Sequence, residues 1–534
     1  MRKKDNLGRE PIHFASSHPH SLELVLKKTG NELASLADEN GCLPIHFSSF
    51  SGSKESLVEL LKLNKDFKLS KDSNENTILH FLATNDKLSL KSIKETFSYI
   101  LTLSRDLLDM KNKNGRTSIH EAAILGNFKY LQAVAEHLSK MELLYYNNMQ
   151  DNFGRSPTHY TAIRGDSKCF RFLVENHADP NLLDKTKLTP IHLATGRNNV
   201  GFINDILHPK TEFTTVINGN LPDKNGWPPI FYACYFSFID IIDSFNLKYS
   251  NFSEVKDNFG NTLAHVAVDA DQISSLEFLI EESIDDDEDE RFIDKKNKIG
   301  VAPIHVAAAK GNEKCLELLL KSGCNVNILD KAKRSALHYA ALYGQISCLT
   351  TLLESQQYSS SLIDVNLTDN EGNTALFYAI VGDYLPCVKE LIKYKAQITM
   401  PNSNARTSFH AAAWYGSIHI CELLFNTNDK LLNKPCSFGR TALHRAAARG
   451  HASIIKFLLS KSADMEVKDT NGTTPLMLAC FYQQVESIIL LLQHKASSTT
   501  KDKHDRTCID YAKAGSTKSP STSKLEAILE LFGE

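Results

Sequence analysis

The stretch Gly439–Asp469, GRTALHRAAARGHASIIKFLLSKSADMEVKD, sets the strongest limit on what this chain can fold into. Thr441 is a candidate N-cap of a first short helix, because its hydroxyl can accept a hydrogen bond from an unpaired backbone N–H. Gly450 is the residue type that ends such a helix in a left-handed conformation. An apolar stripe follows, made of Ile454, Ile455, Leu458 and Leu459. One helix pair cannot bury this stripe alone, so the segment predicts a unit that needs stacked copies.

Copies of this unit run along the chain. If the position of His444 is taken as a marker, equivalent residues follow one another at intervals of 33, 34, 39 or 40 residues. The markers are His13, His46, His80, His120, His159, His192, Phe231, His265, His305, His338, Phe377, His410, His444, Met477 and Asp510. Fifteen markers, eleven of them histidine, predict a repeat array in place of the three or four globular domains that 534 residues would otherwise suggest.

The TALHRAA segment and the period near 33 residues resemble the ankyrin-repeat family, whose units carry a T-P-L-H-x-A pattern. The resemblance covers nearly the whole chain. It implies an all-α solenoid of about fifteen helix–turn–helix units with short turn or hairpin tips. It implies little about function, because this fold is an interaction scaffold for unrelated partners.

Departures from the repeat divide the array into four predicted segments. Residues 1–197 hold repeats one to six, with a long helix at Leu88–Leu108, and residues 198–294 hold two irregular repeats with an insertion at Asn198–Leu221 and an acidic loop at Glu281–Glu290. Residues 295–513 hold repeats nine to fifteen with a serine-rich insertion at Tyr358–Leu362, and residues 514–534 form a linker and a short helix. No polar capping unit precedes the first turn, so we expect another element to cover that face or the sequence to be part of a longer one.

Composition narrows the class of protein. The net charge of −3 and the pI near 6.7 give no bulk basic surface for nucleic acid. No run approaches ~18 apolar residues, and no apolar core follows the charged start, so we expect neither a membrane span nor a signal peptide. Eleven cysteines occur without a CxxC pair, and Cys169, Cys315, Cys348 and Cys387 lie ten residues after a marker. These thiols are typical of core positions in a reducing compartment, which predicts a cytoplasmic protein.

Catalytic and metal signatures are missing from the sequence. It contains no GxxxxGK[ST], GxSxG, HExxH or kinase motif, so we predict neither an enzyme nor a cofactor nor a small-molecule substrate. The marker histidines are interpreted as structural, because metal ligands must converge within ~2.0–2.1 Å of one ion and residues one repeat apart cannot. His13, His18 and His20 lie closer together but lack cysteine or carboxylate partners. No metal site is predicted.

A series of arginines precedes the Thr or Ser that begins the first helix of several units. The series comprises Arg9, Arg116, Arg155, Arg334, Arg406, Arg440 and Arg506. Two interpretations stay open. The arginines are surface residues of the turn, as is common in the family that the chain resembles, or they form a stripe for an anionic ligand.

The resemblance also implies where a partner protein would bind. In the family, ligands usually lie on the concave side, against the turn tips and the first helices. Carried over by spacing, the variable positions there select Leu342, Tyr343, Arg406, Trp414, Tyr415, Phe438, Arg440, Arg449, Phe481 and Tyr482, and in the seventh repeat Trp227, Tyr235 and Phe236. Interface hot spots are enriched in Trp, Tyr and Arg, which favours binding for the row as a whole. For any single aromatic residue, packing between repeats stays an alternative.

Two subfamilies are similar below the level of the fold. Gly41–His46 with Phe50–Glu55, and Leu431–Lys434 running into Gly439, look like repeats of the ankyrin-subfamily transient receptor potential cation channels. Those channels carry a long cytosolic array before a pore, and this chain has no pore helices. Array length, cysteines in second helices and GRTALHRAA-type units resemble regulatory ankyrin subunits of protein phosphatase 6. We predict a non-enzymatic protein-binding scaffold or adaptor. The cytosolic region of such a channel and a phosphatase subunit are the alternatives.

Overall fold

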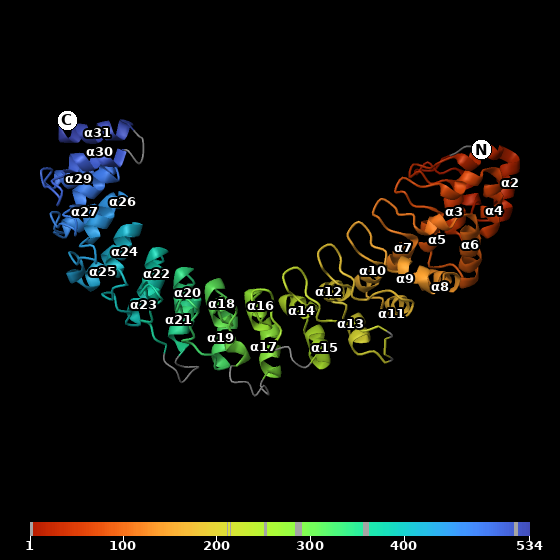
Figure 1. Ribbon diagram of the computed structural model, residues 1–534, viewed down its shortest axis with the longest axis horizontal. Coiled ribbons are helices and arrows are strands. Elements are labelled where there is room, and N and C mark those ends of the chain that lie inside the picture. Colours follow the sequence, from red (N-terminus) through yellow and green to blue (C-terminus); the bar gives the residue numbers. More distant parts are fainter. Residues whose placement is uncertain are drawn as a thin grey trace. The chain divides into compact units, whose positions relative to one another are not determined.

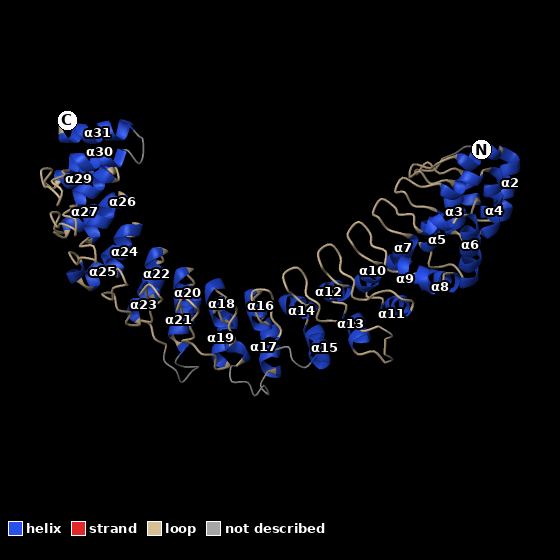
Figure 2. Cartoon of the chain, in the orientation of Figure 1, coloured by secondary structure: helices blue, strands red, loops and turns tan. Residues whose placement is uncertain are grey.

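The computed structural model describes residues 4–210, 212–213, 215–249, 254–283, 291–355, 363–516 and 522–533. Helices and turns make up these ranges, and none of their residues lies in a strand (Figure 2). The all-α fold predicted from the sequence is therefore confirmed. Most of the acidic loop and the serine-rich insertion lie outside the described residues.

The chain divides into two compact units, residues 1–259 (unit 1) and 260–534 (unit 2). In unit 1 the first helices of the successive pairs are α1 (Pro11–Ala15), α3 (Pro44–Phe50), α5 (Ile78–Ala83), α7 (Ser118–Leu125), α10 (Pro157–Arg164), α12 (Pro190–Gly196) and α14 (Pro229–Phe236). Their second helices are α2 (Pro19–Thr29), α4 (Lys54–Leu63), α6 (Leu90–Leu103), α8 (Phe128–His137), α11 (Ser167–Glu175), α13 (Val200–Leu207) and α15 (Ile239–Tyr249). An extra helix α9 (Lys140–Tyr146) and the short 3₁₀ turns η1 (Asn31–Ser35), η2 (Lys65–Leu69) and η3 (Arg105–Leu108) join some pairs.

Unit 2 repeats the same plan. Its first helices are α16 (Leu263–Asp269), α18 (Pro303–Lys310), α20 (Ala336–Leu342), α22 (Ala375–Val381), α24 (Ser408–Tyr415), α26 (Ala442–Arg449), α28 (Pro475–Phe481) and α30 (Cys508–Ser516). Its second helices are α17 (Ile273–Glu282), α19 (Glu313–Lys321), α21 (Ile346–Leu353), α23 (Leu385–Lys393), α25 (Ile418–Thr427), α27 (Ala452–Ser460), α29 (Val485–Gln493) and α31 (Thr522–Phe532), with 3₁₀ turns η5 (Phe292–Asp294) and η7 (Asp429–Leu431).

Within each unit the helices form two layers. First helices pack on the first helices of the next pair, as α24 does on α26, and second helices pack on second helices, as α25 does on α27 (Figure 1). Small side chains allow the close approach of the first helices, since Ala446 and Ala447 of α26 are fully buried. Ile454, Ile455 and Leu458 of α27 are fully buried as well. The apolar stripe predicted from the sequence is thus covered by neighbouring pairs.

The ends of α26 show why these residues form helices. Thr441 is the N-cap with an extended backbone, and Gly450 follows the last turn at φ +81°, the left-handed conformation that the sequence predicted. Thr441 and His444 form a capping box at this end: Nδ1 of His444 accepts the N–H of Thr441 at 3.1 Å, and the Thr441 side chain faces the N–H of His444. The predicted N-cap role of Thr441 is therefore confirmed.

The predicted insertion at Asn198–Leu221 was wrong over its first half. Val200–Leu207 is the regular helix α13, whose Phe202, Ile203 and Ile206 are buried in the second-helix layer. A helix of eight residues shows too few apolar positions for its period to be read from the sequence. The prediction of a long helix at Leu88–Leu108 is close to the observed α6, which has 14 residues and is followed by η3. The four predicted segments stay a prediction.

All eleven cysteines are buried thiols outside any disulfide. Burial, together with nearby carboxylates, raises the pKa of Cys315 and of Cys348 to about 12, so these side chains behave as small apolar core residues. Within the described ranges, no helix is long and apolar enough to span a lipid bilayer.

Candidate functional site

The turn before most first helices is built around one acidic or amide side chain. In the turn at Asp330, Oδ1 accepts the N–H of Arg334 at 2.7 Å, while Oδ2 accepts the hydroxyl of Tyr339 at 2.9 Å and Nε of Arg334 at 2.9 Å. Burial by itself raises the pKa of Asp330. These hydrogen bonds and the guanidinium charge lower it by a larger amount, so the net pKa lies below the ordinary value. Asp330 is therefore an ionised acceptor that holds its loop tip.

The marker histidines connect neighbouring turns. His410 accepts the N–H of Thr407 on Nδ1 at 3.2 Å, and its Nε2 donates to the carbonyl of Arg440 in the next turn at 3.0 Å. Burial lowers the pKa of His410 to about 4, so the ring is neutral and carries the one N–H that this geometry needs. No group of His, Cys, Asp and Glu that could hold a metal ion occurs among the described residues. The hydrogen bonds of His410 and His444 to the next turn support a structural part for these rings.

Six of the seven arginines of the predicted series lie beside a turn aspartate. The pairs are Arg9–Asp5, Arg116–Asp151, Arg155–Asp184, Arg334–Asp330, Arg440–Asp469 and Arg506–Asp502, with N–O distances from 2.7 to 3.7 Å. These six are turn residues with local partners, which supports the first of the two interpretations. Arg406 differs. Among the described residues, no carboxylate lies within 4.0 Å of its guanidinium, and its buried Nε has no hydrogen-bond partner.

Ten of the predicted binding residues lie in unit 2, on the ends of first helices and on the turn tips. We call this set the recognition surface: Leu342, Tyr343, Arg406, Trp414, Tyr415, Phe438, Arg440, Arg449, Phe481 and Tyr482. Four rings are well exposed, with Tyr343 at 53%, Tyr415 at 47%, Phe438 at 49% and Tyr482 at 47%. Arg449 is exposed too, and the other five residues are half-buried. The sequence therefore placed most of this set at the solvent boundary, and its role in binding stays a prediction.

Trp414 is less exposed than its position in the helix predicted. The guanidinium carbons of Arg445 and Arg449 lie 5.3 and 4.8 Å from the centre of its ring, at cation–π distance. The Trp414 carbonyl accepts Nε2–H of His451 at 2.9 Å. The indole is thus held by the next repeat. Phe481 is similar, since its ring packs edge-on against Tyr511 at 6.3 Å, so the packing alternative holds in part for both residues.

The three predicted residues of unit 1 form an aromatic cluster. The ring of Trp227 lies 5.5 Å from Tyr232 and 5.8 Å from Tyr235, and its Nε1 donates to Asp257 Oδ2 at 3.3 Å. Tyr235 is 38% and Phe236 47% exposed, whereas Trp227 is half-buried. Trp227 therefore connects its own repeat to the turn of the next one, and Tyr235 and Phe236 offer exposed surface.

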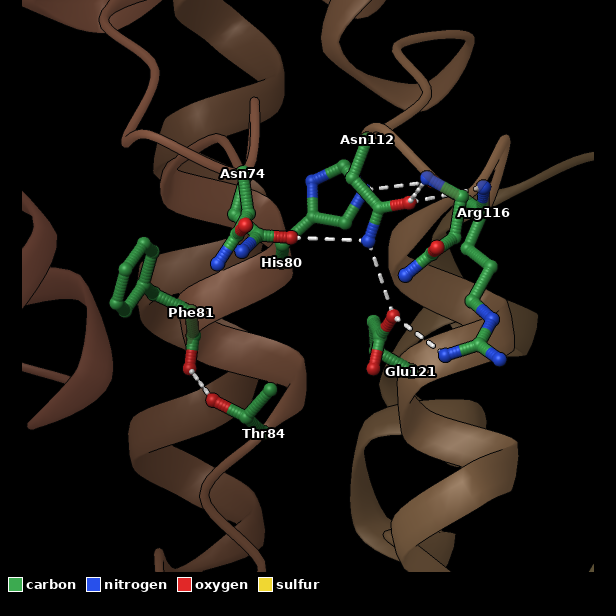
Figure 3. Close-up of a pocket in the computed structure, with 9 residues that line it drawn as sticks. Asn74, His80, Phe81, Thr84, Asn112, Arg116 and Glu121 are labelled. Carbon is green, nitrogen blue, oxygen red and sulfur yellow. Dashed lines mark hydrogen bonds and ion pairs between the residues drawn. The ribbon is translucent and has the colours of Figure 1, made fainter. Parts of the chain in front are cut away.

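Unit 1 contains a polar pocket that the sequence did not predict (Figure 3). It measures about 300 Å³ and is lined by Asn74, Asn76, His80, Phe81, Thr84, Asn112, Asn114, Arg116 and Glu121. Asn112 stands where most turns have aspartate, so its Nδ2 can donate to Glu121 Oε1 at 3.1 Å. Burial raises the pKa of Glu121. Amide and carboxyl groups in this arrangement suit a hydrogen-bonding ligand such as peptide backbone. The asparagines at turn positions are the sequence feature that could have predicted this pocket.

Stacked helix pairs joined by hydrogen-bonded turns define a helical solenoid of repeats. The chain belongs to the ankyrin-repeat family, because the family model described as ankyrin repeats (3 copies) matches residues 132–216, 286–361, 356–434 and 409–502, more than half of the chain. Ankyrin repeats are protein-interaction domains.

Relatives of known identity extend this result. The chain is 24% identical over 515 residues to human transient receptor potential cation channel subfamily A member 1, covering 92% of this chain and 43% of that protein. It is 28% identical over 181 residues to the Caenorhabditis elegans homolog of that channel subunit, covering 33% of this chain and 14% of the homolog. The chain thus spans less than half the length of either relative. The crystal structure of the ankyrin repeat domain of Bcl-3 is similar at 25% identity and a TM-score of 0.38, over 44% of this chain and 99% of that domain.

Proposed function

We propose that this chain binds a partner protein through the recognition surface of unit 2 and that it has no catalytic role. The observation that carries the proposal is the exposure of Tyr343, Tyr415, Phe438 and Tyr482, each about half accessible on a first-helix end or a turn tip. Large exposed rings are unfavourable on a surface that only meets water, and they are the side chains that dominate protein interfaces. Arginines lie among them, which adds hydrogen-bond donors to the apolar contacts.

The proposal is tested by crosslinking and substitution. A photo-crosslinking amino acid at Tyr415 captures the partner from native extract, and mass spectrometry identifies it. The double variant Tyr343→Ala, Tyr415→Ala should then weaken binding of the purified partner by about thirtyfold or more, since one hot-spot aromatic contributes ~2 kcal/mol. Tyr145→Ala in unit 1 is the matched control, because that ring is 58% exposed and lies outside the surface. Equal loss in both variants, or none in the double variant, would contradict the proposal.

A second candidate rests on the similarity to the channel subunit. It extends over 92% of this chain, far beyond one or two repeats, and this supports a role as the cytosolic ankyrin region of a transient receptor potential ankyrin-type channel. A cytoplasmic location belongs to both proposals and agrees with the buried free thiols. Sequencing of the native transcript tests the second candidate. A reading frame that continues into several apolar spans of ~20 residues supports it, and a stop codon after Glu534 contradicts it. The phosphatase alternative stays a prediction.

A further inference from the structure

The turn at Cys436 has the backbone of the other turns but not their carboxylate. The Cys436 N–H donates to the carbonyl of Arg440 at 2.9 Å, as the Asp330 N–H does to that of Arg334 at 3.0 Å. Where most turns have a carboxylate, this turn has the Cys436 thiol, a weak hydrogen-bond acceptor. The preceding turn has the uncharged amide of Asn402 at this position, and its Nδ2 donates to Asn373 Oδ1 at 2.9 Å. Two successive turns of unit 2 therefore lack the usual negative charge.

Two arginines occupy the positions whose side chains bind the carboxylate in other turns. Arg440, Arg155 and Arg116 each reach the aspartate of the following turn, and Arg406 is the equivalent residue before the turn at Cys436. The second is Arg445, nine residues after Cys436. In five other repeats this position holds a tyrosine whose hydroxyl donates to the turn aspartate: Tyr160, Tyr232, Tyr339, Tyr378 and Tyr511.

Both guanidiniums keep unused donors. Nε of Arg406 and Nε of Arg445 are buried without a hydrogen-bond partner among the residues that the structure describes. Arg445 is only 6% exposed, and its hydrogen bond to the protein is a long one from Nη2 to Sγ of Cys436 at 3.6 Å. Burial lowers the pKa of Arg445, and the nearby charges of Arg406 and Arg440 lower it further. Buried charges are normally paired, so this arrangement is incomplete without an anion.

We propose that Arg406 and Arg445 bind one aspartate or glutamate side chain of the partner protein. The proposal rests on the function proposed above and names the chemistry that the recognition surface reads. The other turns indicate a carboxylate, because most of them have an aspartate at this position that accepts hydrogen bonds from the same two places: Asp469 from the arginine of the preceding turn, and Asp330 from the residue nine positions later. Exposed Tyr415 and Phe438 nearby in the sequence would contact the residues on either side of the acidic side chain. Exposed Arg449, over the Trp414 ring, supplies a third guanidinium near the surface.

The decisive variant returns the carboxylate to the chain itself. Cys436→Asp should pair with Arg406 and Arg445, raise the unfolding midpoint and occupy the site. The probe is a fluorescein-labelled peptide, Gly-Tyr-Glu-Asp-Glu-Tyr-Gly, titrated by fluorescence anisotropy. We expect saturable binding to the unmodified protein and at least tenfold weaker binding to Cys436→Asp. Cys436→Ser, which adds no charge, should bind as the unmodified protein does. Ser460→Asp, at an exposed position of α27, adds the same net charge elsewhere and should also leave binding unchanged.

Three further arms separate the outcomes. A peptide with Gln and Asn in place of Glu and Asp should not bind. If a version with phosphoserine in place of the acidic residues binds more tightly than the acidic peptide, the choice of a carboxylate ligand is overturned. Arg445→Tyr reproduces the residue of five other repeats, so it should fold and lose binding at least tenfold. Unchanged binding in Arg445→Tyr or in Cys436→Asp overturns the proposal. If partner binding still depends on Tyr343 and Tyr415 in that event, the protein-binding function stands without it.

Discussion

His444 joins two successive turns of unit 2, because its Nε2 donates to the carbonyl of Thr473 at 3.0 Å while its Nδ1 accepts the N–H of Thr441 at 3.1 Å. The imidazole is fully buried, so both bonds lie out of reach of water. One side chain thereby satisfies a backbone donor at a helix start and a backbone acceptor of the next repeat. This is the physical reason for a histidine at each regular marker.

Replacing that ring should weaken the array locally. His444→Ala leaves a buried N–H and a buried carbonyl unpaired, and we expect a loss of about 1–3 kcal/mol in the free energy of unfolding. Urea titration followed by circular dichroism measures it. His419→Ala, at an exposed position of α25, is the control and should change little. Excess EDTA should leave the unfolding midpoint of the unmodified protein unchanged, and a fall of several degrees would contradict the structural interpretation of these rings.

Acid should destabilise the array before its carboxylates titrate. Burial lowers the pKa of His120, His159, His305, His410 and His444 to about 4, whereas an unfolded histidine titrates near 6.5. Between these two values the unfolded chain binds more protons, so stability falls as the pH drops from about 6.5 to about 4. At pH 5, each such histidine would lower the free energy of unfolding by on the order of 1–2 kcal/mol.

Thermal unfolding between pH 7.5 and 4.5 measures this slope. His444→Gln, which keeps an acceptor and a donor but does not titrate, should flatten it. Burial by itself raises the pKa of the turn aspartates Asp330 and Asp469, but hydrogen bonds and arginines lower it to a net value below the ordinary one, so these groups lose their stabilisation only at lower pH. A midpoint that stays constant from pH 7 to 5 would rule out neutral buried histidines.

The turn glycines should tolerate no side chain. Gly439 has φ +72°, and a Cβ placed there would lie 2.9 Å from the backbone N of Thr470, which donates to the carbonyl of Phe438 at 2.9 Å. Gly439→Ala should therefore cost about 1–3 kcal/mol through strain and the displaced hydrogen bond. Gly201→Ala in α13 is the matched control, because no atom apart from the local backbone of that helix lies within 4 Å of its Cβ position. Differential scanning calorimetry should show a lower midpoint for the first variant and an unchanged or higher one for the second.

Amide exchange should be fastest where the repeat is interrupted. The described residues between α13 and the turn at Asp223 form no helix, so few of their N–H groups have a partner in a regular element. We expect faster exchange there than in α26 and α27, whose buried faces lie in the core. Proteases should first cleave the same interval or the predicted acidic loop. Uniform protection along the chain, measured by mass spectrometry, would contradict this expectation.

Most of the fold could be predicted because the rules that determine it are local. The residues Thr441, His444 and Gly450 fix the ends of one helix through contacts within that helix and its next neighbour, and the same spacing marks the other units. α13 was missed because its eight residues offer too short a pattern between irregular segments.

The candidate site was predicted less well, because it depends on contacts between repeats. The sequence spacing placed Trp414 at the surface, but the side chains that cover it, Arg445 and Arg449, come from the next helix pair. The neutral turn at Cys436 was visible in the sequence, since the turn residues of most units are aspartate. What could not be read from the sequence is that Nε of Arg406 and Nε of Arg445, which come from different repeats, are both buried without a hydrogen-bond partner among the described residues.

The backbone hydrogen bonds between turn tips limit where residues can be inserted into or deleted from such a chain. The N–H of Thr470 bonds to Phe438, that of Ser437 to Asn404 and that of Ser403 to Glu371, so each tip is tied to the one before it. In unit 1 the extra helix α9 and the residues after α13 lie instead between a second helix and the following turn. Genetic insertions and deletions at those junctions leave the tip spacing intact. An affinity tag or a fluorescent reporter is best placed there, because the tips and first helices then keep their alignment.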